Sequence, residues 1–417
     1  MAGKRTILLL LFLIELGITG SFSQKFSEFS ADSEEFLDQM NDLFSQVNSK
    51  EDKNTCEEMM EQFTGYWNTG VFNKEIKDRI KLISNHMLNR RLRAWPDFYN
   101  YLSANMAMMD FDHSAESYEA WHQSIDQLVN DKRSSKPIKS FLETSHNLLY
   151  NNVLYESRAT MWKSSTYDFV FEYDSTPVVV FEDLHLTCLA YSDSSVIYST
   201  KGKFYPIDNY WYGQTGNIKW VRAGYDPNVV YAELSKYELS LSFSRFSADT
   251  VKFYHKDYWN RPLLGSLEEK VLANVTEEKA TYPQFRSYHT QVEVKSVYED
   301  VDYLGGIEVR GRKLIGIGLE GNMALLTFKK NKKEFIRVMS DNYVIYPERV
   351  SSAFATATIH YKEDSIFHPG LKMNYVNENR ELSLVRAGEG NSKSPYYDSF
   401  HNLECLFIVL QHRPCIG

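Results

Sequence analysis

Hydrophobic residues in the first third of the chain recur every three or four positions. The positions that define six such segments include Phe36, Met40, Phe63, Trp67, Ile80, Ile83, Phe98, Tyr101, Trp121, Ile125, Phe141 and Leu148. This spacing places the apolar side chains on one face of an α-helix. Ser33 and Ser114 precede two of the segments and are expected to be N-cap residues, while Pro96 and Pro137 open two others. We therefore expect six short helices that pair as antiparallel hairpins.

After Trp162 the hydrophobic pattern changes to a period of two. Tyr237, Leu239 and Leu241, for example, alternate with polar residues. Alternation of this kind points successive side chains to opposite faces of a β-strand. The sequence therefore predicts an α+β protein with segregated modules, in which an N-terminal all-α module of helical hairpins precedes an all-β region with a solenoid-like or curved sheet.

Two regular spacings suggest that the β-region contains repeated units. A tyrosine precedes a proline by eight residues at Tyr198–Pro206, Tyr254–Pro262 and Tyr361–Pro369. We interpret each span as a strand, a short turn and a second strand that ends at the proline, with chance matches in a tyrosine-rich chain as the alternative. Glycines recur every five residues at Gly306, Gly311, Gly316 and Gly321. Short strands with glycine corners would produce that spacing, and so would two ordinary hairpins.

The N-terminal residues have the order of a cleavable secretory signal. Lys4 and Arg5 precede an apolar run, and small residues at Ser21 and Ser23 stand before Gln24. The apolar run is too short to span a membrane, and no later run reaches that length. We predict cleavage between Ser23 and Gln24, which would place the mature protein in the periplasm, at the outer membrane or outside the cell. The expected division is a signal peptide at 1–23, a helical module at 24–161, a β-rich region at 162–402 and a tail at 403–417.

Composition narrows the range of partners. The chain of 417 residues has a formal net charge of −9 and no basic face evident in its sequence, so nucleic acid is not an expected partner. Aromatic residues make up 14% of the chain, which suits half-buried strands and also supplies flat surfaces for sugars. Four cysteines are too few to imply a disulfide framework, and whether Cys405 pairs with Cys415 stays open.

No sequence motif for catalysis is present. The chain lacks HExxH, paired CxxC, GxSxG, P-loop and dinucleotide-binding patterns, so we expect no metal and no cofactor. Carboxylate pairs are too numerous to select a glycosidase pair. Lys329–Lys333 is interpreted as the charged tip of a hairpin, with a phosphate or lipid-headgroup contact as the alternative. Whether the protein is an enzyme is left open, and a non-catalytic role is favoured.

The densest aromatic cluster supplies the candidate site. Tyr210, Trp211 and Tyr212 are consecutive, and Trp220 follows shortly after Gly216. Aromatic rings stack on sugar rings, so these four side chains are the candidate ligand-binding residues. The core of a hairpin is an equally simple explanation.

Several segments resemble the N-terminal part of large uncharacterised cell-envelope proteins of Gram-negative Bacteroidota. The segments that carry the resemblance are Arg90–Tyr101, Ala190–Pro206, Leu264–Lys270 and Ser394–Tyr397. It covers most of the chain from about Lys25 to His401, and a glutamine after the signal also fits such bacteria. The resemblance implies export and a longer parent chain, and no reaction is assigned to the family.

The end of the chain departs from that pattern. Leu403–Leu410 is interpreted as one more buried strand, after which the sequence stops at Gly417. We therefore expect a truncated tail whose last strand is either an exposed edge or loosely paired with the body.

Three hypotheses for function follow. The favoured one is a non-catalytic, exported cell-envelope scaffold or interaction protein that contacts glycan, lipid or other envelope proteins through its β-region. Ser247–Tyr254 is loosely similar to strand repeats of periplasmic lipopolysaccharide-transport proteins, which is the lipid variant of this hypothesis. The second is a secreted protein that binds or cleaves polysaccharide. The third is a helical-repeat adaptor with a purely structural β-region, although no fixed helical period is evident.

Overall fold

The computed structural model describes residues 27–111, 113–272, 275–319, 321–386, 393–406 and 409–412. The predicted signal peptide with its cleavage site, and Cys415, lie outside the described residues. Contacts divide the chain into two compact units: residues up to 106 with 126–135, and residues 107–125 with 136 onward.

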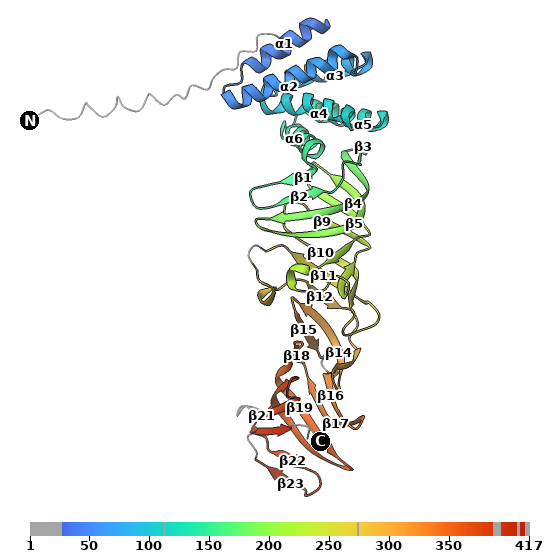
Figure 1. The fold of residues 1–417 in the computed structure, drawn as a ribbon, viewed down its shortest axis with the longest axis vertical. Coiled ribbons are helices and arrows are strands. Elements are labelled where there is room, and N and C mark those ends of the chain that lie inside the picture. Colours follow the sequence, from blue (N-terminus) through green and yellow to red (C-terminus); the bar gives the residue numbers. More distant parts are fainter. Residues whose placement is uncertain are drawn as a thin grey trace, which may run out of the picture. The chain divides into compact units, whose positions relative to one another are not determined.

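The described helices before the first strand are α1 (Ser33–Ser45), α2 (Lys50–Thr69), α3 (Lys74–Asn89), the short helical turn η1 (Ala94–Phe98), α4 (Tyr99–Asp110), α5 (Ala115–Asn130) and α6 (Lys136–Asn151). All six predicted helices are confirmed (Figure 1). In the first unit, the apolar faces of α1 and α2 meet, and the Phe36 and Trp67 rings stack with centroids 5.1 Å apart. Both side chains are fully buried, as their helical spacing predicted.

One of the two predicted N-caps is wrong. The α1 helix is capped by Asp32, whose carboxylate accepts hydrogen bonds from the backbone N–H groups of Glu34 and Glu35. Ser33 is the first helical residue, because an aspartate one position earlier both accepts these bonds and places negative charge at the helix N-terminus. The cap of α5 is confirmed, since Ser114 Oγ accepts a hydrogen bond of 3.1 Å from Ser117 N.

The described residues after α6 form β-strands, with the two short 3-10 helices η2 (Val221–Ala223) and η3 (Glu277–Lys279) in the connections. The first half contains β1 (Val153–Glu156), β2 (Met161–Ser164), β3 (Val170–Tyr173), β4 (Pro177–Ala190), β5 (Asp193–Tyr205), β6 (Tyr210–Gln214), β7 (Asn217–Lys219), β8 (Val230–Glu233), β9 (Lys236–Ser240), β10 (Arg245–His255), β11 (Leu263–Lys270) and β12 (Gln284–Ser287). The second half contains β13 (Val292–Tyr298), β14 (Val301–Arg310), β15 (Lys313–Ile317), β16 (Ala324–Lys330), β17 (Lys333–Ser340), β18 (Asn342–Ile345), β19 (Arg349–Tyr361), β20 (Asp364–Val376), β21 (Glu381–Val385), β22 (Tyr396–Asp398), β23 (Leu403–Cys405) and β24 (Val409–His412). A helical region followed by an all-β region confirms the predicted fold class.

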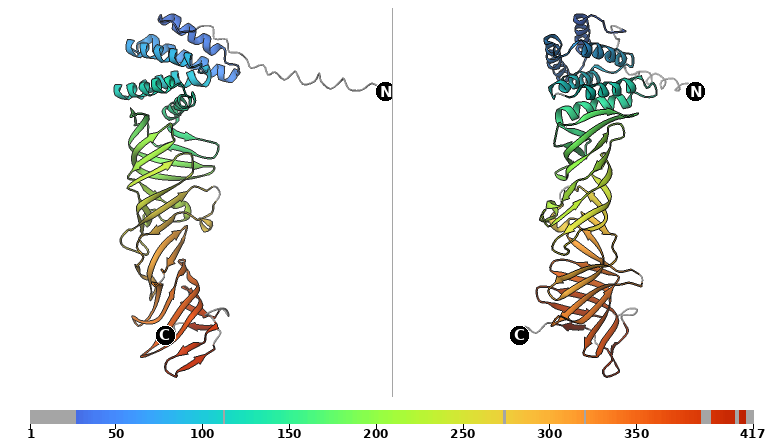
Figure 2. Two further views of the ribbon diagram at one scale, coloured as in Figure 1. Left: turned by 180° about the vertical axis from the view of Figure 1, so that it is seen from behind. Right: turned by 90° about the vertical axis from the view of Figure 1, so that its right-hand side faces the viewer.

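The strands of the second unit pair in one antiparallel network, and its early part branches at β5. From β1 the pairing runs through β2 and β4 to β5. One end of β5 pairs with β7, and the pairing continues to β8, β10, β11 and β12. The other end of β5 pairs with β6, which pairs with β9. In Figure 2 the strand colours run broadly from green through yellow to red along this unit.

The equal Tyr–Pro spacing does not correspond to a repeated structure. The span from Tyr198 follows one strand, β5, to its end at Tyr205, directly before Pro206, while the span from Tyr254 crosses the turn between β10 and β11. The third span ends inside β20, at Pro369. Different backbone paths over the same eight-residue interval show that the spacing does not define a repeated unit.

Three of the four spaced glycines belong to one ordinary hairpin, and Gly321 lies in the connection that follows it. Gly311 forms the turn between β14 and β15 with a positive φ of 58°, and Gly316 lies in β15 opposite Ile307. A Cβ atom on Gly316 would lie 2.7 Å from Cε2 of the buried Tyr303 ring. The Tyr303 hydroxyl donates to Gly306 O and accepts from Ile317 N, which fixes the position of the ring. Gly316 leaves the space that the ring needs there.

The C-terminal segment is not one buried strand. It forms two short strands, β23 and β24, which pair with β22 and β21. Leu403, Leu406 and Val409 are largely exposed. Burial of the whole segment is not found, whereas the expected exposed edge, paired with the body, is confirmed at these three positions; Phe407 and Ile408 lie outside the described residues.

Candidate ligand-binding cleft

The predicted aromatic cluster is divided between the surface and the core. The alternation of β6 points Tyr210 and Tyr212 outward, where they are 38% and 46% exposed. Trp211 and Trp220 are fully buried and offer no ring face to a ligand. The expectation that all four side chains contact one ligand is therefore corrected, and the two tyrosines remain as candidates.

The two tryptophans have structural partners instead. Trp211 Nε1 donates a hydrogen bond of 3.1 Å to the Tyr237 hydroxyl, which is also hydrogen-bonded to Thr200 Oγ1. Burial raises the pKa of Tyr237 to about 12, so this hydroxyl stays protonated at neutral pH. A Cβ atom on Gly213 would lie 2.1 Å from the Tyr237 ring, which explains the glycine after Tyr212.

Sequence reasoning missed a third surface tyrosine. Tyr205 lies opposite Tyr210 in the β5–β6 register, and its ring meets the Tyr212 ring edge-on with centroids 5.2 Å apart. The Tyr210 and Tyr212 centroids are 6.1 Å apart. The signal was the period of two in β5, which puts Tyr205 on the face opposite the buried Phe204.

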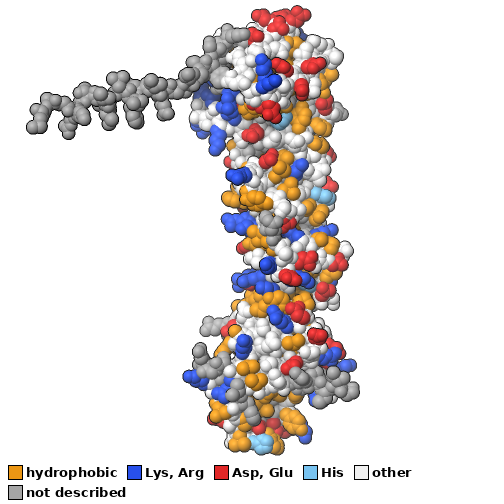
Figure 3. Space-filling view, turned by 60° about the vertical axis from the view of Figure 1, so that its left-hand side comes forward, with side chains coloured by type: hydrophobic (Ala, Val, Ile, Leu, Met, Phe, Trp, Pro, Cys, Tyr) orange, Lys and Arg blue, Asp and Glu red, His pale blue; other side chains and the backbone are white. Residues whose placement is uncertain are grey.

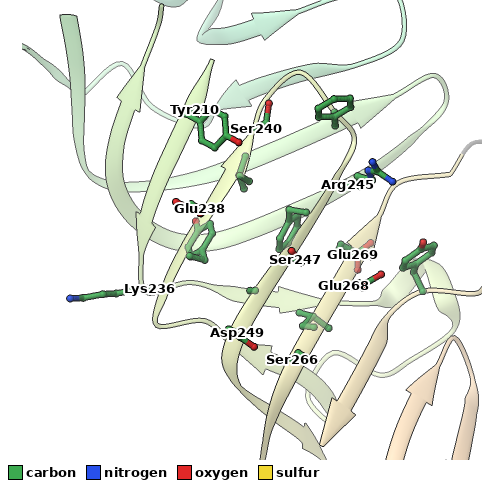
Figure 4. A pocket seen from close by; sticks show the side chains of 17 residues that line it. Tyr210, Lys236, Glu238, Ser240, Arg245, Ser247, Asp249, Ser266, Glu268 and Glu269 are labelled. Carbon is green, nitrogen blue, oxygen red and sulfur yellow. The ribbon is translucent and has the colours of Figure 1, made fainter. Parts of the chain in front are cut away.

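A cleft of about 800 Å³ opens next to Tyr210, between β9 and the first half of β10 (Figure 4). These strands are consecutive and joined by residues 241–244, yet no backbone ladder connects them in this fully described segment. Instead β9 pairs with β6, and residues 245–248 of β10 pair with β11. The strands β9 and β10 separate here because their partner strands, β6 and β11, belong to different branches of the sheet.

The cleft combines an apolar floor with polar walls. Its floor includes the buried side chains of Tyr237, Leu239, Phe246 and Leu267. Its walls carry polar side chains, and those labelled in Figure 4 include Glu238, Ser240, Arg245, Ser247, Asp249, Ser266 and Glu268. Phe243 in the connecting loop is 54% exposed, and the Arg245 guanidinium lies 5.7 Å from its ring centroid. The facing edges of both strands add backbone N–H and C=O groups without a neighbouring strand.

Two acidic residues of the cleft already have partners. Asp249 accepts a hydrogen bond from the Tyr288 hydroxyl. Glu269 is 1% exposed and accepts hydrogen bonds from Trp220 Nε1 and from the Arg222 guanidinium, which also lies 3.3 Å from Asp193 Oδ2. Glu269 therefore fixes the wall of the cleft, whereas Glu238 and Glu268 project from exposed positions.

No family model, no curated protein and no solved structure matches the chain. Among the described residues, no three His, Cys, Asp or Glu side chains are grouped so that they could hold a metal ion. No helix in the described part of the chain is long and apolar enough to cross a membrane.

Proposed function

We propose that this chain is an exported, non-catalytic interaction protein of the cell envelope, and that it binds a glycan in the cleft between β9 and β10. The basic, apolar and small-residue order of residues 1–23 supports export. The resemblance to envelope proteins of Bacteroidota supports the location. Other envelope proteins are the expected neighbours.

The observation that carries the glycan proposal is the composition of the cleft. Sugar rings present apolar C–H faces and hydroxyl edges, so their sites combine exposed aromatic rings with hydrogen-bonding groups. Tyr210 and Phe243 supply exposed rings at the cleft. The carboxylates of Glu238 and Glu268, three serine hydroxyls and the unpaired strand edges supply acceptors and donors. This mixture suits a polar, uncharged ring better than a lipid chain.

A glycan array followed by calorimetric titration of the best oligosaccharide tests the proposal. The variants Tyr210→Ala and Phe243→Ala are expected to weaken binding by about tenfold each, because each removes a stacking surface. The control is Tyr361→Ala, since Tyr361 is 67% exposed and does not line the cleft. Equal affinities of all four proteins, or no glycan bound at millimolar concentration, would contradict the proposal. Release of reducing ends from the bound glycan would favour the polysaccharide-cleaving hypothesis instead.

The unpaired strand edges support a second candidate, which is capture of an extended polypeptide. A strand added between β9 and β10 would pair with both edges, as in other cases of β-strand addition. In that case a peptide array would yield ligands where the glycan array yields none. Tyr210→Ala would then have little effect, because backbone pairing rather than ring stacking would supply the affinity.

A further inference from the structure

A second surface lies outside the cleft, on the outward face of β5, β7, β8 and β10. These strands are neighbours in this order, and none of the residues discussed next lines the cleft. Tyr231 of β8 lies opposite Tyr254 of β10, and their rings stack with centroids 4.4 Å apart and planes 12° from parallel. Lys219 of β7 lies opposite Tyr231 on its other side. Tyr198 of β5 and Lys256, which follows β10, also belong to this surface. We name the five residues the tyrosine–lysine row: Tyr198, Lys219, Tyr231, Tyr254 and Lys256.

Lysines lie against the tyrosine rings of the row. The Lys256 ammonium is 5.3 Å from the centroid of Tyr231, and the Lys219 ammonium is 5.1 Å from the centroid of Tyr198. A cation–π contact orients the ammonium group while leaving its charge unneutralised. The tyrosines are half-buried and both lysines are exposed, so the cationic groups stay accessible to a ligand.

The row holds positive charge that the described residues do not neutralise. Lys252 is paired with Glu233, with Nζ and Oε2 3.6 Å apart. Lys219 and Lys256 form no ion pair with any described carboxylate. In a chain with a net charge of −9, these two lysines are exposed positive charges that can attract an anionic group.

The spacing of the row suits a linear anionic polymer. Neighbouring strands lie about 4.8 Å apart, and Tyr198 on β5 and Tyr231 on β8 are two strands apart, so the ammonium groups that lie against these two rings are separated across the strands by roughly 10 Å. Two sugar units of an extended polysaccharide that crosses the strands would span a similar distance, so the carboxylates of every second unit would have the spacing of the ammonium groups. These carboxylates could then meet the ammonium groups, and the sugar hydroxyls could meet the tyrosine hydroxyls.

We propose that the tyrosine–lysine row binds an acidic polysaccharide laid across β5, β7, β8 and β10. The same charges would attract a nucleic acid, but single-stranded nucleic acids depend on bases that stack on free aromatic faces. Tyr231 already has Tyr254 and Lys256 against its ring, and Tyr198 has Lys219. The row therefore presents cations and phenol edges rather than open rings. This inference is independent of the glycan proposed for the cleft.

The test measures binding of the full chain to polygalacturonate, with neutral dextran as the matched uncharged polymer. The double variant Lys219→Gln/Lys256→Gln is expected to weaken polygalacturonate binding by about tenfold, and added salt should weaken binding to the unmodified chain. The control is Lys132→Gln/Lys362→Gln, which removes the same charge at exposed positions outside the row and should bind like the unmodified chain.

Three results would overturn the inference. The first is equal polygalacturonate binding by the two double variants, and the second is equal binding to dextran. The third is tighter binding to single-stranded DNA than to polygalacturonate. The variants Tyr210→Ala and Phe243→Ala separate the two sites. If they abolish polygalacturonate binding while the row variant retains it, the ligand occupies the cleft, and only the inference about the row is overturned.

Discussion

Glu268 and Glu269 are neighbours in β11 with opposite environments. Glu268 is exposed at the cleft, whereas Glu269 is buried against Trp220 and Arg222. One step along a strand reverses the face, so two identical side chains acquire different roles. One is available to a ligand, and the other holds β11 against the segment that follows β7.

Glu269→Ala is expected to lower the free energy of unfolding by about 3 kcal/mol, because it leaves Trp220 Nε1 without an acceptor and leaves Arg222 only the part-exposed Asp193 as an ion-pair partner. The matched change at the next residue, Glu268→Ala, should cost less than about 0.5 kcal/mol. Urea unfolding of both variants checks this. Equal losses of stability in the two variants would contradict the assignment of Glu269 to the wall of the cleft.

His255 makes stability depend on pH. Its ring is buried among Tyr225, Tyr258 and Trp259, and its Nδ1 has no hydrogen-bond partner. Burial lowers the pKa of His255 from 6.5 to about 4. Between these values the unfolded chain binds the proton and the folded chain does not, so stability falls as the pH falls.

We predict that the unmodified chain loses about 1–2 kcal/mol more stability between pH 7 and pH 5 than the variant His255→Phe does. The exposed His289 provides the control, and His289→Phe should keep the full pH dependence. Chemical unfolding at both pH values measures the difference. The account of His255 fails if its variant shows the same pH dependence as the unmodified chain.

At the scale of elements, local patterns predicted more than long-range pairing. The six helices followed from the spacing of apolar residues, because that spacing is a property of a single segment. The cap at Asp32 was missed since two adjacent residues could both cap a helix. The cleft was not predictable, because it exists only since β9 pairs with β6 and β10 pairs with β11, instead of β9 pairing with β10. Tyr210 and Trp211 were both selected because they belong to a dense aromatic cluster in the sequence. Only the alternation of β6 shows that Tyr210 is exposed and Trp211 is buried.

Phe171 of β3 tests how the helices and strands of the second unit are joined. Its ring lies 6.4 Å from Trp121 of α5 and 6.3 Å from Phe141 of α6, and its backbone N–H donates to Ser117 Oγ. Phe171→Ala should cost about 3–5 kcal/mol, since it opens a cavity between helix and strand. The adjacent Val170 is 39% exposed, and Val170→Ala should cost less than about 1 kcal/mol. Thermal unfolding compares the two, and similar melting temperatures would show that this contact is not a stabilising one.

At the scale of the molecule, the cleft and the tyrosine–lysine row both belong to the second unit, which also contains α6 and the start of α5. Figure 3 shows acidic and basic side chains interspersed over the visible face. A short row of unpaired lysines can therefore act locally without a strongly charged domain around it. The first unit carries neither of the proposed sites.

For the molecule as a whole, the sequence predicts export, with cleavage at one defined bond. When the full precursor is produced in a Gram-negative host, the exported protein should begin at Gln24. N-terminal sequencing of the periplasmic and extracellular fractions measures this. Exported protein that still begins at Met1 would remove the support for a cleaved signal.

Amide hydrogen exchange with and without the best-binding oligosaccharide tests the central claim most directly. The facing edges of Lys236–Ser240 and residues 245–249 have no strand partner, so their amides should exchange faster than those of β6 and β11 in the free protein. Bound glycan is predicted to slow exchange at these edges and at Phe243. Protection confined to other strands, or unchanged exchange at saturating glycan, would contradict a binding site in the cleft.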